Sequence, residues 1–429
     1  MQKQRYMNFN DVINMVVMKT AYKYRAYPSK EQTETLNMQM CLSKELYNLL
    51  LEKSKAYYGE TGKTLTEYRM NIWITQIKKE KTEFAELHSQ VLQNVSKRVS
   101  DAYRHFFRRC KEKKQGKKVK VGFPRYKKFV SSLTYPQING FKVEKKKVEL
   151  SKIGRINFVN HREVEGTMKT LTIKKTKSQE WYITISTEKE NITPFTNGKP
   201  RVGIDLGITN YAALSNGQVL TNAEPTKQRR KSLKRLQQRI SRKKKGSRNR
   251  RKAAFNFARE YEHTHRTTED NLHKLSCNLV HSYSFIAYED LQIQNMMRNH
   301  HLARAIGEAS WGNFAQLIQY KAESAGCVAV GVNPQNTSKM CSGCGNVQDI
   351  GRKRTYNCNR CGMSEDRDLN AAKNILERAL NSKSSNFDGF PVKTTEGHSG
   401  SHASGDFAPT PQKEDASRTV ESGTIFGVS

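Results

Sequence analysis

Apolar and polar positions along the first 190 residues follow two different periods. Residues 18–28 alternate as a β-strand does, and so do four short stretches within 142–188. Residues 30–58 and 66–112 instead repeat apolar side chains every three or four positions, most clearly over 87–106, which predicts long helices with one buried face. The pattern therefore predicts a small β-barrel with helices inserted into it.

From residue 201 the pattern changes to short buried strands separated by helices. Val202–Leu206, Ser284–Tyr288 and Val328–Val332 have the length and apolar content of strands in an α/β sheet. Gln218–Thr221 is expected to pair with the first of them through Asn216-Gly217, a dipeptide that favours tight hairpin turns. Strands that alternate with helical segments predict an α/β domain.

Charge narrows the class of partner. The chain has 75 Lys and Arg against 40 Asp and Glu, a net charge of +35. This excess is far beyond what solubility requires and is typical of proteins that bind nucleic acid. The densest run, Lys227–Lys252, holds 15 Lys or Arg and no acid, which predicts a helical region facing phosphates. No stretch is apolar enough to predict a membrane span or a secretory signal.

Four cysteines form two C-x-x-C pairs separated by thirteen residues: Cys341, Cys344, Cys358 and Cys361. This spacing predicts a zinc ribbon, and a closed set of four thiolates is structural rather than catalytic. The other four cysteines are scattered along the chain. Disulfides are therefore not expected, and the compartment is predicted to be reducing.

Three carboxylates occupy positions typical of a divalent-metal site. Asp205 lies on the first strand of the α/β segment, Glu289 ends a later apolar strand, and Asp368 begins the last helical pattern. Each alone has a simpler interpretation: a G-x-D-x-G turn, or a helix cap. In this order they match a ribonuclease-H-like architecture, in which three carboxylates bind two ions. Gly203 and Gly207 beside Asp205 are expected to let the chain approach a ligand closely.

With these residues identified, the chain resembles the TnpB (OrfB) proteins of bacterial and archaeal insertion sequences, which are relatives of the compact type V CRISPR effectors. The resemblance runs from about Met18 to Asp406. Its markers include Phe123-Pro124-Arg125-Tyr126-Lys127, Gly203–Gly207, Tyr288-Glu289-Asp290-Leu291, and the cysteines followed by Asp366–Ala372. It departs from the family in residues 1–17, which precede the usual start, in Ser404 where a cysteine is expected, and in its long tail.

The resemblance implies an RNA-guided DNA endonuclease with one RuvC-like site that cuts double-stranded DNA beside a short flanking motif. It implies two Mg²⁺ ions (or Mn²⁺) at Asp205, Glu289 and Asp368, one structural Zn²⁺, and a guide RNA. The family pattern D-x-N-A-A favours Asp368 over Asp366. We expect a monomer with its RNA, or alternatively a dimer, in a prokaryotic cytoplasm near the nucleoid. The alternatives are a regulator that binds DNA without cutting, a transposase, and a type V CRISPR effector.

The resemblance and the composition together divide the chain into segments and suggest nucleic-acid contacts. The predicted segments are a leader (1–17), a β-barrel with a helical insertion at about 30–120 (18–190), a linker (191–200), the first part of the nuclease domain (201–336), a zinc ribbon (337–362), the last part of the nuclease domain (363–380) and a disordered tail (381–429). The candidate contacts are Tyr47, Gln90, Gln93, Arg125, Ser132, Thr134, Gln137, Lys231, Arg235, Arg242, Lys243 and Lys244. Aromatic residues among cations, namely Phe106, Phe107, Phe123, Tyr126 and Phe129, are further candidates for stacking on unpaired bases.

Overall fold

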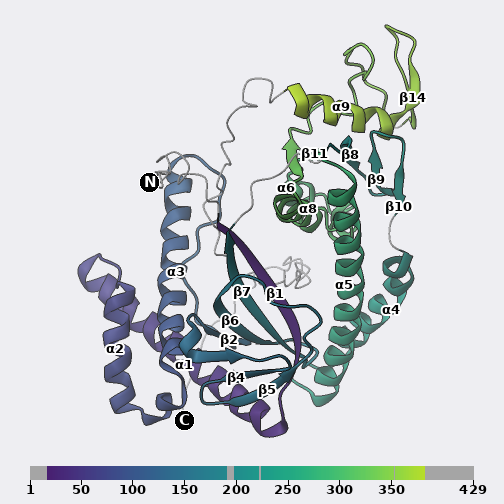
Figure 1. Ribbon diagram of the computed structural model, residues 1–429. Coiled ribbons are helices and arrows are strands. Elements are labelled where there is room, and N and C mark those ends of the chain that lie inside the picture. The colour runs from purple at the N-terminus through teal and green to yellow at the C-terminus, as the bar shows by residue number, and fades with distance from the viewer. Residues whose placement is uncertain (1–16, 191–197, 222–223, 352, 382–429) are drawn as a thin grey trace, which may run out of the picture. The chain divides into compact units, whose positions relative to one another are not determined.

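The computed structural model describes residues 17–190, 198–221, 224–351 and 353–381 (Figure 1). Residues 1–16 of the predicted leader, most of the predicted linker and tail, and Ser404, where the chain departs from the family, lie outside the described residues. Among the described helices, none is long and apolar enough to cross a membrane.

The N-terminal part contains a seven-stranded antiparallel sheet in the order β2-β6-β7-β1-β5-β4-β3. Its edge strands, β2 and β3, follow each other in the chain through the short η2 turn, so the sheet curls into a nearly closed barrel. The first of the four short stretches with strand alternation, residues 142–150, is not one strand. It forms a hairpin of two strands, because Glu144–Lys147 forms a turn. The strands are β1 (Val17–Tyr27), β2 (Ser132–Tyr135), β3 (Phe141–Val143), β4 (Lys147–Leu150), β5 (Gly154–Phe158), β6 (Thr167–Lys175) and β7 (Trp181–Glu190), and η2 is Ile138–Gly140.

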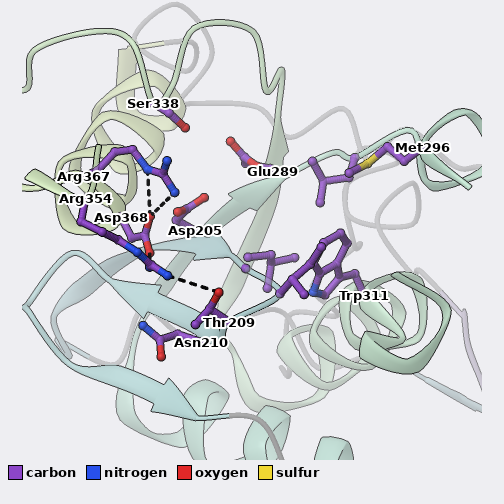
Figure 2. Close-up of a pocket in the computed structure, with 14 residues that line it drawn as sticks. Asp205, Thr209, Asn210, Glu289, Met296, Trp311, Ser338, Arg354, Arg367 and Asp368 are labelled. Carbon is purple, nitrogen blue, oxygen red and sulfur yellow. Dashed lines mark hydrogen bonds and ion pairs between the residues drawn. The ribbon is translucent and has the colours of Figure 1, made fainter. Parts of the chain in front are cut away.

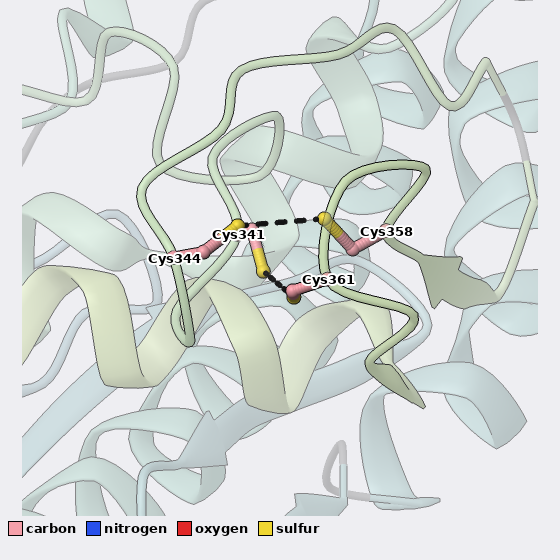
Figure 3. Close-up of side chains that lie close together, drawn as sticks. All are labelled: Cys341, Cys344, Cys358 and Cys361. Carbon is pink, nitrogen blue, oxygen red and sulfur yellow. Dashed lines mark hydrogen bonds between the residues drawn. The ribbon is translucent and has the colours of Figure 1, made fainter.

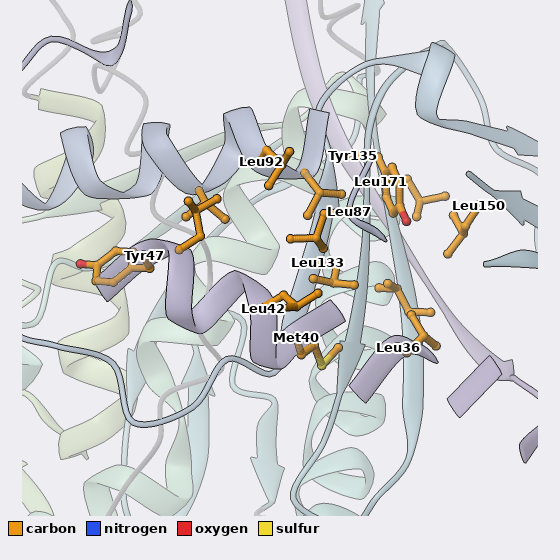
Figure 4. Close-up of a cluster of buried hydrophobic side chains, with 14 of the residues drawn as sticks. Leu36, Met40, Leu42, Tyr47, Leu87, Leu92, Leu133, Tyr135, Leu150 and Leu171 are labelled. Carbon is orange, nitrogen blue, oxygen red and sulfur yellow. The ribbon is translucent and has the colours of Figure 1, made fainter. Parts of the chain in front are cut away.

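Three helices lie between β1 and β2 in the chain: α1 (Lys30–Thr61), α2 (Glu67–Glu80) and α3 (Ser89–Lys114). Helices α1 and α3 pack on the sheet, and α2 packs on α3. Ser29 and Gln32 form a capping box that starts α1, and Gly62 ends it at φ 65°. On the face predicted for α3, Val91, Val95 and Val99 are buried and join α1 and the sheet in one core (Figure 4), whereas Ala102 and Phe106 are partly buried. The pattern over 66–112 is not one helix, because a 3₁₀ turn, η1 (Thr82–Glu86), separates α2 from α3.

The second part is built on a five-stranded sheet in the order β10-β9-β8-β11-β12. β8, β9 and β10 are antiparallel, whereas β11 runs parallel to both β8 and β12. The expected hairpin was incomplete: Asn216-Gly217 joins β9 to β10, and β9 lies between β10 and β8. The strands are β8 (Arg201–Leu206), β9 (Asn210–Leu214), β10 (Val219–Thr221), β11 (Phe285–Glu289) and β12 (Val328–Val332).

Helices accompany this sheet, and α4 packs along α5 (Figure 1). The helical region predicted from the basic run Lys227–Lys252 is part of a helical hairpin, because residues 242–247 form a turn between α4 and α5. The helices are α4 (Glu224–Ser241), α5 (Arg248–Ser282), α6 (Ile293–Met296), α7 (Ala303–Ala309), α8 (Trp311–Ala325) and α9 (Arg367–Asn381). A two-stranded ribbon, β13 (Thr355–Asn357) and β14 (Ser364–Asp366), precedes α9.

Close contact between β8 and α9 fixes the last helix on the sheet. A Cβ on Gly203 would lie 2.1 Å from the carbonyl oxygen of Ala372 and 2.9 Å from Leu376 Cβ. Gly203 was expected to make room for a ligand, but the backbone of α9 lies against it instead. For Gly207 the expectation stays a prediction. Gly203 admits the helix backbone, and a Cβ on Gly207 would collide with the carbonyl of Asn210 in the turn to β9.

This contact generates the first prediction. Gly203→Ala should lower the free energy of unfolding of this domain by about 2–3 kcal/mol, since overpacking against backbone cannot be relieved by a rotamer change. Urea denaturation followed by tryptophan fluorescence measures the loss. Gly307→Ala, on α7 of the same domain, is the control, because its added Cβ would meet only Met297 Cε at 4.0 Å. Equal stability of the two variants would contradict the packing role.

Candidate functional site

Three carboxylates from three elements line one cavity of about 240 Å³ (Figure 2). Asp205 is on β8 and Glu289 ends the neighbouring parallel strand β11, where Ile204 pairs with Tyr288. Asp205 and Glu289 are the next residues on these two strands. Their backbones therefore lie about one strand spacing, ~4.8 Å, from each other. Asp368 reaches the same cavity from the first turn of α9.

Burial disfavours the ionised forms of Asp205 and Glu289, and repulsion by neighbouring carboxylates adds to this effect at Asp205. Burial, followed by the charges of Glu289 and Asp368, raises the pKa of Asp205 to about 8. Burial also raises the pKa of Glu289, although Thr337 Oγ1 donates to Glu289 Oε1 at 2.6 Å and opposes this shift. A cluster that holds protons at neutral pH is one that a bound cation would stabilise.

Two arginines line the cavity beside Asp368. Arg367 Nε and Nη2 donate to Asp368 Oδ1 at 3.2 and 3.1 Å. Arg354 Nη1 lies 3.6 Å from Asp368 Oδ2, and its Nη2 donates to Thr209 Oγ1 at 3.3 Å (Figure 2). Neither Arg354 nor Arg367 was predicted from the sequence. Arg367 could have been suspected beside Asp368, but Arg354 lies in the cysteine segment and carries no local signal.

The structure assigns different positions to Asp366 and Asp368. Asp366 Oδ1 accepts from the backbone N–H groups of Asp368 and Leu369 at 2.9 and 3.1 Å, so it caps α9. Asp368 lines the cavity and Asp366 does not. The helix-cap role that the sequence left open for Asp368 therefore belongs to Asp366.

The four cysteines converge as their spacing predicted (Figure 3). The Sγ atoms of Cys341 and Cys361 lie 3.7 Å apart, and those of Cys344 and Cys358 lie 3.6 Å apart. A tetrahedral zinc with bonds of ~2.3 Å requires sulfur atoms about 3.8 Å apart. Backbone N–H groups, that of Cys361 first, lower the pKa of Cys358 to about 6, which favours the thiolate that binds metal.

Among the described residues, these cysteines are the one group of three or more metal-binding side chains whose ligand atoms all lie within 4.8 Å of one another. The three carboxylates do not form a second such group.

Two asparagines of α9 hold the cysteine segment against the carboxylates. Asn370 Nδ2 donates to the carbonyl of Met340 at 2.7 Å, and Asn370 Oδ1 accepts from Ser342 N at 2.8 Å. Asn374 Nδ2 donates to the carbonyl of Thr337 at 2.9 Å. Both asparagines are fully buried. The segment that contains the cysteines therefore also positions Thr337, the donor to Glu289.

The nucleic-acid candidates of the N-terminal part fall into two groups. Tyr47 is buried beneath the ammonium of Lys127, and the buried Gln90 donates to Gln137 Oε1 at 3.3 Å. The other candidates remain accessible: Gln93, Arg125 and Gln137 are exposed, and Ser132 and Thr134 on β2 are partly exposed.

The candidates of the basic hairpin all lie at its surface. Lys231 and Arg235 are exposed on α4, and Arg242, Lys243 and Lys244 are exposed in the turn between α4 and α5. Arg250 donates to the carbonyl of Lys243 at 2.9 Å, which helps to hold this turn.

Family models match three stretches of the chain. A model described as "Probable transposase" matches residues 184–300, and one described as "Cas12f1-like, TNB domain" matches residues 311–375. A "Helix-turn-helix domain" model matches residues 15–63, which in this structure form β1 and α1.

Relatives match over most of their length. A "Putative RNA-guided DNA endonuclease" of Streptomyces pristinaespiralis is 32% identical over 380 residues, which cover 85% of this chain and 90% of that protein. "Putative RNA-guided DNA endonuclease InsQ" of Escherichia coli (strain K12) is 28% identical over 377 residues, or 83% and 91% of the two chains. A solved Cas12f1–sgRNA–target DNA complex matches with a TM-score of 0.49 at 17% identity, covering 81% of this chain and 83% of that one.

The raised pKa of Asp205 generates the second prediction. The pKa of Asp205 is near 4 in the unfolded chain and about 8 in the folded protein. Its carboxyl group therefore lowers the stability of the folded protein progressively as the pH rises between these two values. Asp205→Asn should therefore be more stable than the wild type without divalent ions, by about 1–3 kcal/mol more at pH 8 than at pH 5. Thermal melting in magnesium-free buffer measures this difference. Asp290→Asn, at an exposed neighbour of Glu289, is the control and should show no such trend.

Proposed function

The chain belongs to the TnpB (OrfB) family of RNA-guided DNA endonucleases, and from this membership we propose that it cuts DNA beside a short flanking motif at Asp205, Glu289 and Asp368. The observation that carries the proposal is the convergence of these three carboxylates, from β8, β11 and α9, on one cavity. The strand order supports a RuvC-like, ribonuclease-H-like domain, since three antiparallel strands are followed by two parallel ones and a closing helix.

The donor set fits hard divalent cations. The three side chains offer carboxylate oxygens, the ligands that Mg²⁺ and Mn²⁺ prefer. When bound, two such ions supply an activated water and stabilise the leaving 3′ oxygen of the phosphodiester. Asp205 interacts electrostatically with both other carboxylates, which suits a ligand shared by the two ions. Glu289 would be oriented by Thr337, whose hydroxyl engages one of its oxygens.

Arg354 and Arg367 would balance charge in this site. They neutralise Asp368 here, and both line the cavity. With a cation at Asp368, the guanidinium groups would be available to a phosphate oxygen, which arginine can bind through two parallel hydrogen bonds. Arg354 in this way links the cysteine segment to the position where the scissile phosphate would lie.

We assign one structural zinc to Cys341, Cys344, Cys358 and Cys361. The set offers four sulfur ligands at the separations of a tetrahedral zinc and leaves no fourth position for water. The ribbon would act indirectly, because Asn370 and Asn374 connect the cysteine segment to the helix that carries Asp368.

Guide RNA and target DNA are the partners that the charge distribution supports. The exposed cations of the α4–α5 hairpin suit phosphate contacts that ignore base sequence. The accessible amides and hydroxyls near β2 suit reading of the flanking motif. With one carboxylate site, the two DNA strands would be cut in sequence. The alternative, a regulator that binds DNA without cutting, gives no reason for three carboxylates to converge on one cavity.

The third prediction distinguishes the proposed metal ligands, Asp368 among them, from the helix cap Asp366. Asp205→Ala, Glu289→Ala and Asp368→Ala should each slow cleavage at least about 100-fold, because each removes a ligand of ions that contribute several kcal/mol. Asp366→Asn should retain cleavage, since asparagine caps a helix as well as aspartate does. Cleavage of supercoiled plasmid and gel-shift binding of the target are measured together. Cutting by Asp368→Ala, or loss of binding in all three variants, would contradict the assignment.

The fourth prediction concerns zinc. The purified protein should contain about one zinc per chain, because the four thiolates form one closed site. Cys344→Ser should lose most of this zinc and become sensitive to protease within the domain that carries α9. Cys41→Ser, at an exposed cysteine of α1, should keep both zinc and protease resistance. A folded, active preparation without zinc would rule the site out.

A further inference from the structure

Two large aromatic side chains stand exposed on the segment between α3 and β2. Phe106, Phe107 and Phe123, also suggested for base stacking, pack together instead: the ring centroids of Phe106 and Phe123 lie 5.0 Å apart. Tyr126 is 50% exposed and Phe129 is 70% exposed. The structure therefore separates an aromatic core from a pair of rings that face solvent.

The segment that carries these rings is pinned at several points. Asn48 of α1 binds the backbone of Lys127 in both directions: its Nδ2 donates to the carbonyl at 3.0 Å and its Oδ1 accepts from the amide at 2.8 Å. The carbonyl of Ser131 accepts from Lys175 N at 2.8 Å. Phe129 thus lies between two backbone anchors, and little conformational freedom remains to be lost when a ligand stacks on its ring.

The surroundings of the exposed rings are positive. Residues 113–130 contain eight Lys or Arg and no Asp or Glu. The Lys55 ammonium lies 4.3 Å from the centroid of the Tyr126 ring, and Arg125 and Lys128 are exposed on the same segment. Exposed aromatic rings among cations are the arrangement with which proteins hold unpaired nucleotides, because the rings stack on bases while the cations meet phosphates.

We propose that Phe129, supported by Tyr126, stacks on an unpaired DNA base where the target duplex opens beside the flanking motif. This inference rests on the proposed function. DNA is favoured over the guide because Phe129 is three residues before Ser132, the first of the proposed motif readers on β2. Three extended residues span ~10 Å, or about three base-pair steps of 3.4 Å. A phenyl ring has no hydrogen-bonding group, so it would hold an opened base of any identity.

The test compares Phe129→Ala, Phe129→Tyr and wild type, each purified with its co-expressed guide RNA. Two DNA targets are used: a fully paired duplex, and the same duplex with a mismatched bubble of four base pairs next to the flanking motif. Phe129→Ala should cut the duplex about 5- to 150-fold more slowly, as expected for one lost stacking contact. It should cut the bubble at the wild-type rate, and Phe129→Tyr should cut both normally. Tyr68→Ala, which removes a 75% exposed ring of α2, is the matched control.

A second measurement does not depend on cleavage. In magnesium-free buffer, 2-aminopurine placed at the first target positions should report unstacking from its DNA neighbours with the wild type and less so with Phe129→Ala. Equal signals and equal cutting rates in the two proteins would overturn the inference. So would an equal loss of rate on both targets together with less co-purified RNA, which would assign Phe129 to the guide. Failure of the wild type to cut either target, with a normal 2-aminopurine signal, would overturn the proposed function but not the stacking contact.

Discussion

The nuclease domain depends on the direct contact between the backbone of α9 and strand β8 at Gly203. No side chain separates the two elements there, so the helix lies closer to the sheet than ordinary packing allows. This closeness brings Asp368 to the cavity that Asp205 lines. It also sets the position of Asn370 and Asn374, and through them of the cysteine segment and Thr337. A single glycine thus determines how two proposed metal sites are related.

The same closeness has an electrostatic cost. Three carboxylates share a partly enclosed cavity, and burial together with their mutual repulsion keeps Asp205 protonated at neutral pH. In this structure the cost is reduced by a threonine hydroxyl at Glu289 and by two guanidinium groups at Asp368. Each of these neighbouring groups stabilises one carboxylate, and a bound cation would partly replace them. At the proposed magnesium site, such an arrangement would lower the stability of the free protein and raise its affinity for divalent ions.

Sequence alone was sufficient for the residues whose chemistry requires a rare pattern. Paired C-x-x-C motifs predicted the cysteine cluster, and the order of the carboxylates along the chain predicted which three would meet. Contacts made through space were not predictable. Arg354 and Thr337 lie within a segment whose only local signal was its cysteines, and Asn370 and Asn374 look like ordinary helix residues. Gly203 was recognised as a site of close approach, but a glycine does not reveal whether a ligand or a helix will approach. Strand β9 was missed because Tyr211-Ala212-Ala213-Leu214 is buried throughout and has no alternation.

The distance along the chain between the two halves of this contact has a consequence for synthesis. Gly203 and Ala372 are 372 − 203 = 169 residues apart. At about 5–20 residues per second, a ribosome would need roughly 10–30 s to deliver the second after the first. During that interval the nascent chain can already form its N-terminal sheet and its basic hairpin, the surfaces suited to RNA. Asp205 and Glu289, however, are synthesised before Asp368, so the set of three carboxylates is still incomplete. Translation would therefore complete the surfaces suited to RNA before the three carboxylates can meet.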